Sequence, residues 1–377
     1  MRVVGIAASA VLALGAWWWI DWRPQGGGVV LAARTEAPSP HVPGPATPEP
    51  LRAPTEPVKP GWVQSAVDKA WCDLPVPQAT DQDPPLTHRE LQRAREASTA
   101  QQALTQEMDR LKSDWTTRLR ARGDERSLAL ADLLQGDEAS LQHLEMLASA
   151  STDPAVYAWA FGACSNHADC TLSAARWAQL DPGNLVPWEW EAAHARAASD
   201  PQAQADAVFR IAGSTRSNYY QGERLQLLLT LSEADSEGLQ MAAESGLMSA
   251  AAWREVLPLM QGVTSQCMPP RTAADPAQAS LCLAASEAMW KTSDNLMQSQ
   301  ISIAIGRRAA PQDKQRWISR VAEIAKLMTQ ARQEPVQGAQ SSPCALVLNQ
   351  RRHLQALAAS GELGALRRQQ QTVKSID

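Results

Sequence analysis

Cysteine is the residue type whose spacing offers this chain its most definite chemistry. The count is even, and two pairs lie close together in the sequence, as is typical of exported proteins that fold in an oxidising compartment. A third bridge would then join the two ends of the globular part. The disulfides that we predict on this basis are Cys164–Cys170, Cys267–Cys282 and Cys72–Cys344. Since six cysteines permit about fifteen connectivities, this pairing is a preference.

A metal site is one alternative at the first pair, because His167 lies midway between Cys164 and Cys170. Two thiolates and one imidazole supply three ligands, whereas a structural zinc site is closed by about four. The neighbouring residues offer no further ligand. Free thiols are the other alternative. The disulfide stays the preferred interpretation, and the sequence predicts no metal.

Histidine and carboxylate residues show no catalytic arrangement. The histidines are scattered, and none belongs to a His-Glu-x-x-His pair or lies near a nucleophile elbow, a phosphate-binding loop or a dinucleotide fingerprint. His194 is expected to pack beside Trp190 rather than to act as a general base. Glu189 and Glu191 are two positions apart, so on a helix they face different sides and cannot share acid–base work. We predict no catalytic residues and no cofactor.

Aromatic and arginine side chains supply a candidate binding site. The residues that we expect to line a groove are Trp188, Trp190, Tyr220, Arg216 and Arg224. Aromatic and arginine residues carry most of the binding energy at protein interfaces, so this group predicts capture of a partner protein. The alternative is that at least one of the tryptophans belongs to the core, in which case its removal would unfold the domain.

The elements that must position these residues are helices. From Gly61 onward the composition is dominated by Ala, Leu, Gln, Glu and Arg, and no run alternates cleanly between apolar and polar residues. Asp-Pro pairs at 153–154, 200–201 and 275–276 are typical of an N-cap followed by proline at the first helical position. Short helices joined by short turns predict an all-α, extended array of antiparallel helix pairs. Besides a long helix that ends near Gly123, the helices that we expect span residues 125–135, 137–149, 154–164, 170–180, 186–198, 201–213, 218–232, 237–245, 248–260, 277–291, 293–308, 311–333 and 344–359.

Residues 154–213 resemble a tetratricopeptide-type unit. The run 177–184 (WAQLDPGN) is similar to the close of the second helix in such repeats, where Asp-Pro ends the helix. Trp188 then falls four positions into the next unit, as that pattern expects, and Ala192 takes its small-residue position. Glu191 stands where a leucine is usual, and no period of about 34 residues continues elsewhere. The resemblance implies an irregular array of helical hairpins whose concave groove binds peptides or partner proteins.

The first sixty residues predict a membrane anchor followed by a linker. Residues 3–20 (VVGIAASAVLALGAWWWI) are uncharged and end in tryptophans. They would form roughly 27 Å of helix, at the short end of what spans a bilayer. A signal peptide cleaved near Ala33 is the alternative. The domains that we expect are this anchor (1–23), a disordered Pro-rich linker (24–60), an all-helical repeat-like domain (61–360), and a C-terminal helix end with a flexible tail (361–377).

Charge excludes one class of partner, and composition suggests a location. The net charge is −5 and no long basic run occurs, so we expect no nucleic-acid binding. Arginine outnumbers lysine, as is typical of a GC-rich bacterial genome, and a weak positive-inside bias places the N-terminus in the cytoplasm. We therefore predict a single-pass bacterial inner-membrane protein whose periplasmic domain binds or scaffolds an envelope protein, without a small-molecule cofactor. The alternative is an envelope enzyme, for example one acting on peptidoglycan, with a site assembled from distant helices.

Overall fold

The part of the chain that the structure describes is built from helices. It is a computed structural model and describes residues 88–165, 169–232, 238–253, 260–333 and 343–374. The expected anchor and the Pro-rich linker lie outside these ranges. None of the described helices combines the length and the apolar character that a membrane span requires. The regular elements of the described ranges are helices with one isolated parallel bridge, which confirms the all-α prediction.

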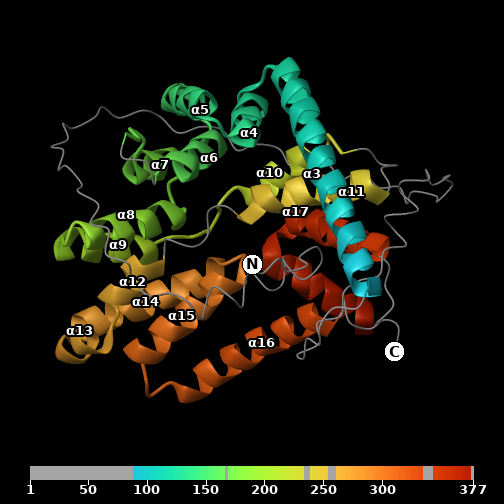
Figure 1. Cartoon of the computed structure of the whole chain (residues 1–377). Coiled ribbons are helices and arrows are strands. Elements are labelled where there is room, and N and C mark those ends of the chain that lie inside the picture. The colour runs from blue at the N-terminus through green and yellow to red at the C-terminus, as the bar shows by residue number, and fades with distance from the viewer. Residues whose placement is uncertain (1–87, 166–168, 233–237, 254–259, 334–342, 375–377) are drawn as a thin grey trace.

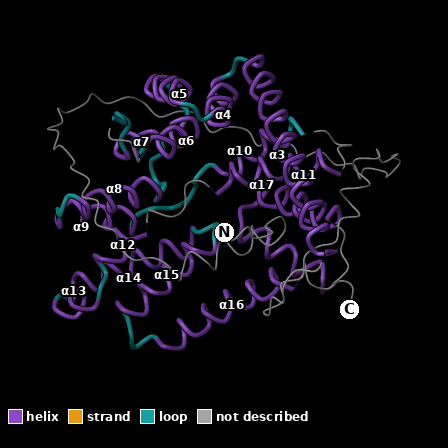
Figure 2. The backbone as a smooth tube through the Cα atoms, viewed as in Figure 1, coloured by secondary structure: helices purple, strands orange, loops and turns teal. Residues whose placement is uncertain are grey.

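The helices follow one another with short connections, as Figure 2 shows. Their bounds, labelled as in Figure 1, are α3 (His88–Arg122), α4 (Glu125–Gln135), α5 (Glu138–Ala150), α6 (Pro154–Cys164), α7 (Ala174–Leu180), α8 (Val186–Ala197), α9 (Pro201–Ala212), α10 (Gln221–Leu229), α11 (Gly238–Trp253), α12 (Met260–Gln266), α13 (Pro269–Ala274), α14 (Pro276–Thr292), α15 (Leu296–Ala309), α16 (Lys314–Gln333) and α17 (Pro343–Lys374).

Helices α6, α9 and α14 begin as predicted, each at the proline of an Asp-Pro pair. Asp153 Oδ1 accepts a hydrogen bond from the backbone nitrogen of Ala155 at 2.8 Å. Asp275 caps α14 in the same way. Asp200 accepts from two successive backbone nitrogens of α9. Each side chain satisfies an N–H group that has no partner within the helix, so the local sequence determines where these helices start.

Several boundaries differ from the expected ones. Helix α10 starts at Gln221 rather than near 218, because Tyr220 has a left-handed backbone with φ of 58° and a helix cannot pass through it. A single helix, α11, covers most of the range in which we expected two. The chain also stays helical to Lys374, beyond a kink at Gly361 with φ of 66°. The part expected as a C-terminal helix end and tail contributes buried side chains, among them Leu363 and Leu366.

The two ends of the helical array meet. Successive helices pack on one another from α3 to α9, α14 packs on α9, and α14 to α17 again pack in order. Helix α17 then returns to α10 and α11, and α11 packs along α3 (Figure 1). One face of α3 points to this interior, where Leu111, Trp115 and Leu119 are buried. The described helices form a closed circuit around one main core.

Both local disulfides are present. Cys164 and Cys170 are bonded with their Cα atoms 5.4 Å apart, and the bridge ties the end of α6 to the segment before α7. Cys267 and Cys282 are bonded with their Cα atoms 5.7 Å apart and tie α12 to α14. Cys72 and the side chain of Cys344 lie outside the described residues, so the third predicted bridge stays a prediction.

Candidate binding groove

The turn between α7 and α8 is joined to the segment that follows α9 by an isolated parallel bridge between Asn184 and Arg216. Gly183 O accepts hydrogen bonds from the backbone nitrogens of Thr215 and Arg216, at 2.9 and 3.1 Å. Gly183 has φ of 93°, and a Cβ there would lie 2.9 Å from Thr215 Oγ1, so only glycine fits this position. The bridge holds two connections at a fixed separation, and a groove lies above them.

Asp181 organises this junction from beneath. Its side chain is fully buried. Oδ2 accepts hydrogen bonds from Tyr220 Oη at 2.5 Å and from Asn184 Nδ2 at 2.7 Å. Arg216 forms an ion pair with the same carboxylate. A buried carboxylate with charged and hydroxyl partners ties the two connections together, because the buried Tyr220 hydroxyl left without it would be an unsatisfied polar group. Burial also raises the pKa of Tyr220 above its usual value, which keeps this hydroxyl a donor.

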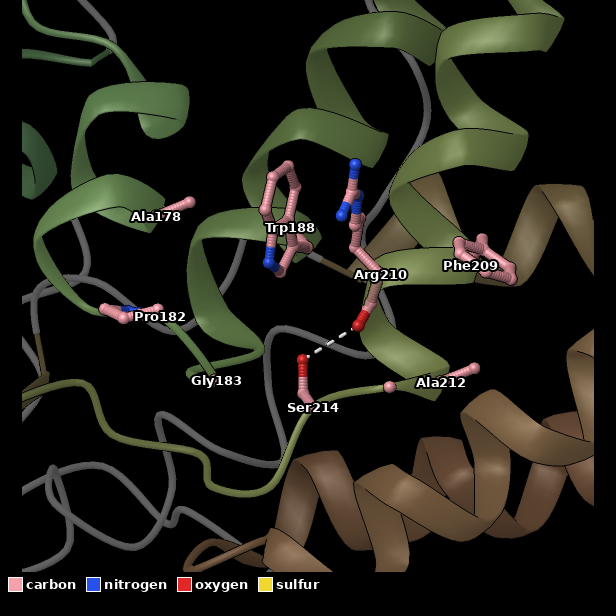
Figure 3. Close-up of a pocket in the computed structure, with 9 residues that line it drawn as sticks. Ala178, Pro182, Gly183, Trp188, Phe209, Arg210, Ala212 and Ser214 are labelled. Atoms are coloured by element: carbon pink, nitrogen blue, oxygen red, sulfur yellow. Dashed lines mark hydrogen bonds between the residues drawn. The ribbon is translucent and has the colours of Figure 1, made fainter. Parts of the chain in front are cut away.

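The groove is a hollow of about 560 Å³ between the end of α7, the start of α8 and the end of α9. Figure 3 shows Ala178 and Pro182 on one side and Trp188 with Arg210 on the other. Ser214 lies below them, and its hydroxyl donates to Arg210 O at 2.9 Å. Most of the other lining residues are apolar or are glycines, so the polar and aromatic groups that a ligand could contact are mainly the Trp188 indole and the Arg210 guanidinium.

Trp188 and Arg210 form a stacked pair. The guanidinium carbon of Arg210 lies 5.7 Å from the centre of the Trp188 ring, within the range of a cation–π interaction. No carboxylate among the described residues lies within ion-pair distance of this guanidinium. Phe209, the neighbour of Arg210, points to the other side of it in Figure 3 and is 65% exposed. Trp188 also packs against the main core and is only partly exposed. The pair therefore presents a positive charge beside the exposed part of an indole ring.

The five residues predicted for this site separate into two groups. Trp188 is half-buried and lines the groove. Arg216 is exposed and belongs to the bridge beneath the groove. The remaining three, Trp190, Tyr220 and Arg224, are buried and cannot reach a partner while the domain is folded, which corrects the prediction that they line the groove. Trp190 does not face the groove because it lies two positions after Trp188, and two positions along a helix turn a side chain to the opposite face.

The three buried residues have internal partners instead. Trp190 packs edge-on against Phe161 with ring centres 5.1 Å apart. Arg224 lies over the Trp159 ring, and its Nη1 donates to Ala251 O at 2.6 Å. The alternative weighed for the tryptophans therefore holds for Trp190.

Phe209 and Arg210 were not predicted as site residues. The buried face of α9 consists of Gln204, Ala207, Val208 and Ile211. Phe209 lies off that face, and an exposed phenylalanine on an amphipathic helix is the signal that could have identified it.

Glu189 follows Trp188 but faces the core. Its carboxylate accepts hydrogen bonds from Tyr219 Oη at 2.6 Å and from Gln298 Nε2 at 2.9 Å. Burial raises the pKa of Glu189 to about 7, and the nearby Asp294 adds to the rise. Burial likewise raises the pKa of Asp294 to about 6, and that of Glu362, which accepts from the backbone nitrogen of Leu296. Both oxygens of Glu189 are occupied, so this carboxyl connects α8 to α15.

No family model matches the chain, and neither curated proteins nor solved structures show a match to it. What the groove does must be argued from its own geometry.

Proposed function

We propose that this chain is a membrane-anchored protein of the bacterial cell envelope that binds another protein through the Trp188–Arg210 groove. The observation that carries the proposal is the stacked pair itself. An arginine that has no carboxylate partner among the described residues lies over a half-buried tryptophan at the edge of a hollow. Tryptophan and arginine are the residues most enriched among those that dominate binding energy.

The support beneath the groove favours binding by a preformed surface. The bridge between Asn184 and Arg216 and the buried Asp181 hold the two connections in one arrangement. A site that is already in its bound shape avoids much of the ordering cost that opposes association. A partner would therefore meet the indole and guanidinium in place, without refolding of the turn.

The location rests on the sequence and on the disulfides. Residues 3–20 have the length and composition of an anchor. Two disulfide bonds support folding in an oxidising compartment, which for a bacterial protein is the periplasm. We infer that residues from Asp21 onward lie outside the cytoplasm. Retention of the protein in membranes after osmotic shock is the expected result, and release of a chain that begins near Ala33 would overturn it.

Capture of a partner from membranes tests the binding function. Crosslinked membranes that contain the tagged full chain are compared with membranes that contain Trp188→Ala or Arg210→Glu. We expect each variant to lose the captured protein by tenfold or more, a loss of about 1.4 kcal/mol or more in binding.

The matched control is Arg307→Glu, which makes the same charge reversal at an exposed position of α15. Equal capture by this control and by the wild type is required. If Trp188→Ala and Arg210→Glu capture the partner as well as the control does, the groove is not the binding site.

A further inference from the structure

The groove defines the chemistry of what can fill it. The Trp188 ring offers a flat apolar face, and Arg210 offers a guanidinium with no carboxylate partner among the described residues. A complementary ligand brings a compact apolar ring to the indole and a carboxylate to the guanidinium. Proline rings dock against aromatic side chains in this way, because an extended proline-rich strand is already ordered and loses little entropy on binding. A glutamate beside a proline supplies both groups at once.

The chain itself contains such a segment. Between Thr47 and Pro57 the sequence reads TPEPLRAPTEP, in which Glu49 has proline on both sides and Glu56 directly precedes Pro57. Two glutamate–proline units thus occur within one short stretch. This pairing of a carboxylate with an adjacent ring is the pattern that the groove requires.

We propose that residues 47–57 occupy the Trp188–Arg210 groove of the same molecule, so that a partner must displace them. This inference rests on the proposed function, because it describes how that same site is regulated. Glu49 or Glu56 pairs with the Arg210 guanidinium, and an adjacent proline ring stacks on the Trp188 indole.

The covalent connection is long enough. Residues 58–87, which separate Pro57 from His88, can span at most about 100 Å at about 3.3 Å per residue. A domain of this size is about 50 Å across. The segment can therefore reach any face of the domain. A covalent tether also keeps a ligand at an effective concentration of about a millimolar, so even weak docking would fill the groove.

Site-specific photo-crosslinking of the full chain tests the proposal. A benzoylphenylalanine replaces Pro182, which is exposed and faces Trp188 across the hollow (Figure 3). A second protein carries the same probe at Ile318, 60% exposed on α16 and not part of the groove. Each is purified in detergent, irradiated and digested, and the crosslinked peptides are identified by mass spectrometry. We expect the first probe to crosslink within one chain to residues 47–57, at least fivefold above the second.

Charge exchange tests the pairing with Arg210. The double variant Glu49→Lys, Glu56→Lys should lower the crosslink yield at least fivefold. The control Asp81→Lys, Asp83→Lys makes the same change in net charge outside the segment and should leave the yield unchanged. Adding Arg210→Glu to the Glu49→Lys, Glu56→Lys variant should restore part of the yield, because the two charges are then exchanged. Without this recovery the yield loss does not arise from an ion pair with Arg210, and the proposed pairing is wrong.

The outcomes separate this proposal from the binding function. Crosslinks between two chains, or to other parts of the same chain, would overturn occupancy by residues 47–57. If the Pro182 probe captures a foreign protein in membranes while the purified chain gives no internal crosslink, the binding function stands and the internal ligand is wrong. An internal crosslink without any foreign protein in membranes would support the internal ligand and contradict the binding function.

Discussion

Trp188 and Glu189 are consecutive residues of α8, and the structure places them in opposite environments. Trp188 borders an open groove beside a guanidinium that lacks a carboxylate partner among the described residues. Glu189 is 3% exposed, and both of its oxygens accept hydrogen bonds from neighbouring elements. On the core side of this helix the Glu189 carboxylate has internal hydrogen-bond partners. On the groove side the nearby Arg210 guanidinium, from α9, has no carboxylate partner among the described residues. Substitutions on the core side should therefore change stability, and those on the groove side should change binding.

The largest difference is expected between the two tryptophans of α8. Trp190→Ala removes a ring that is 5% exposed and packs against Phe161, so it should lower the free energy of unfolding by about 3–5 kcal/mol. Trp188→Ala removes a half-buried ring at the groove and should cost about 1 kcal/mol. Urea denaturation of both variants measures the difference. Equal losses would show that Trp188 is also a core residue, and the comparison of the two sides would fail.

The buried carboxyl of Glu189 should make stability depend on pH. Its pKa is about 7 in the folded chain and near 4.5 when unfolded. The folded state therefore holds the proton more tightly, and this contribution is fully present below about pH 4.5. It is lost as the pH rises towards 7, by roughly 3 kcal/mol in total at about 1.4 kcal/mol per pH unit. The raised pKa of Asp294, about 6, acts in the same direction.

Glu189→Gln tests that origin. A glutamine cannot ionise and still offers an acceptor for Tyr219, so the fall in stability between pH 5 and 7.5 should shrink by at least half. Glu138→Gln, at an exposed position of α5, serves as the control and should keep the wild-type dependence. An unchanged slope in Glu189→Gln would assign the pH dependence to other groups, with Asp294 and Glu362 the next to test.

The hydrogen bond between Tyr220 and Asp181 is buried in the core and supports the groove from beneath, so it links the core side to the groove side. Tyr220→Phe keeps the ring and removes a 2.5 Å bond to a buried carboxylate, which should cost about 1.5–3 kcal/mol. Tyr157→Phe is the matched control, since that hydroxyl is bonded to the backbone of Ser173 and should cost about 1 kcal/mol. If Tyr220→Phe costs no more than Tyr157→Phe, Asp181 does not organise the junction.

Local signals in the sequence predicted a large part of this fold, and long-range ones did not. The Asp-Pro caps and the two short-range disulfides depend on residues close together in the chain, and they were predicted correctly. The return of α17 to α10 and α11 depends on contacts between segments far apart, for which periodicity holds no information. The same limit applies to the site. Helix periodicity places Trp188 and Trp190 on opposite faces but does not say which face is the core, and packing against Phe161 identifies the Trp190 face.

The smallest effect on stability, and the most informative for function, is expected at Arg210. Its guanidinium is exposed and lies over the Trp188 ring, so Arg210→Ala should change the free energy of unfolding by less than about 1 kcal/mol. Binding should nevertheless fall tenfold or more, because the positive charge at the groove is lost. Combining Arg210→Ala with Trp188→Ala in a double-mutant cycle measures whether the two side chains act as one unit. Stacked residues that meet the same ligand should lose less together than the sum of their separate losses. Strict additivity in the binding cycle would mean that the ligand contacts each residue independently. A large loss of stability in Arg210→Ala would show that this arginine supports the core rather than the groove.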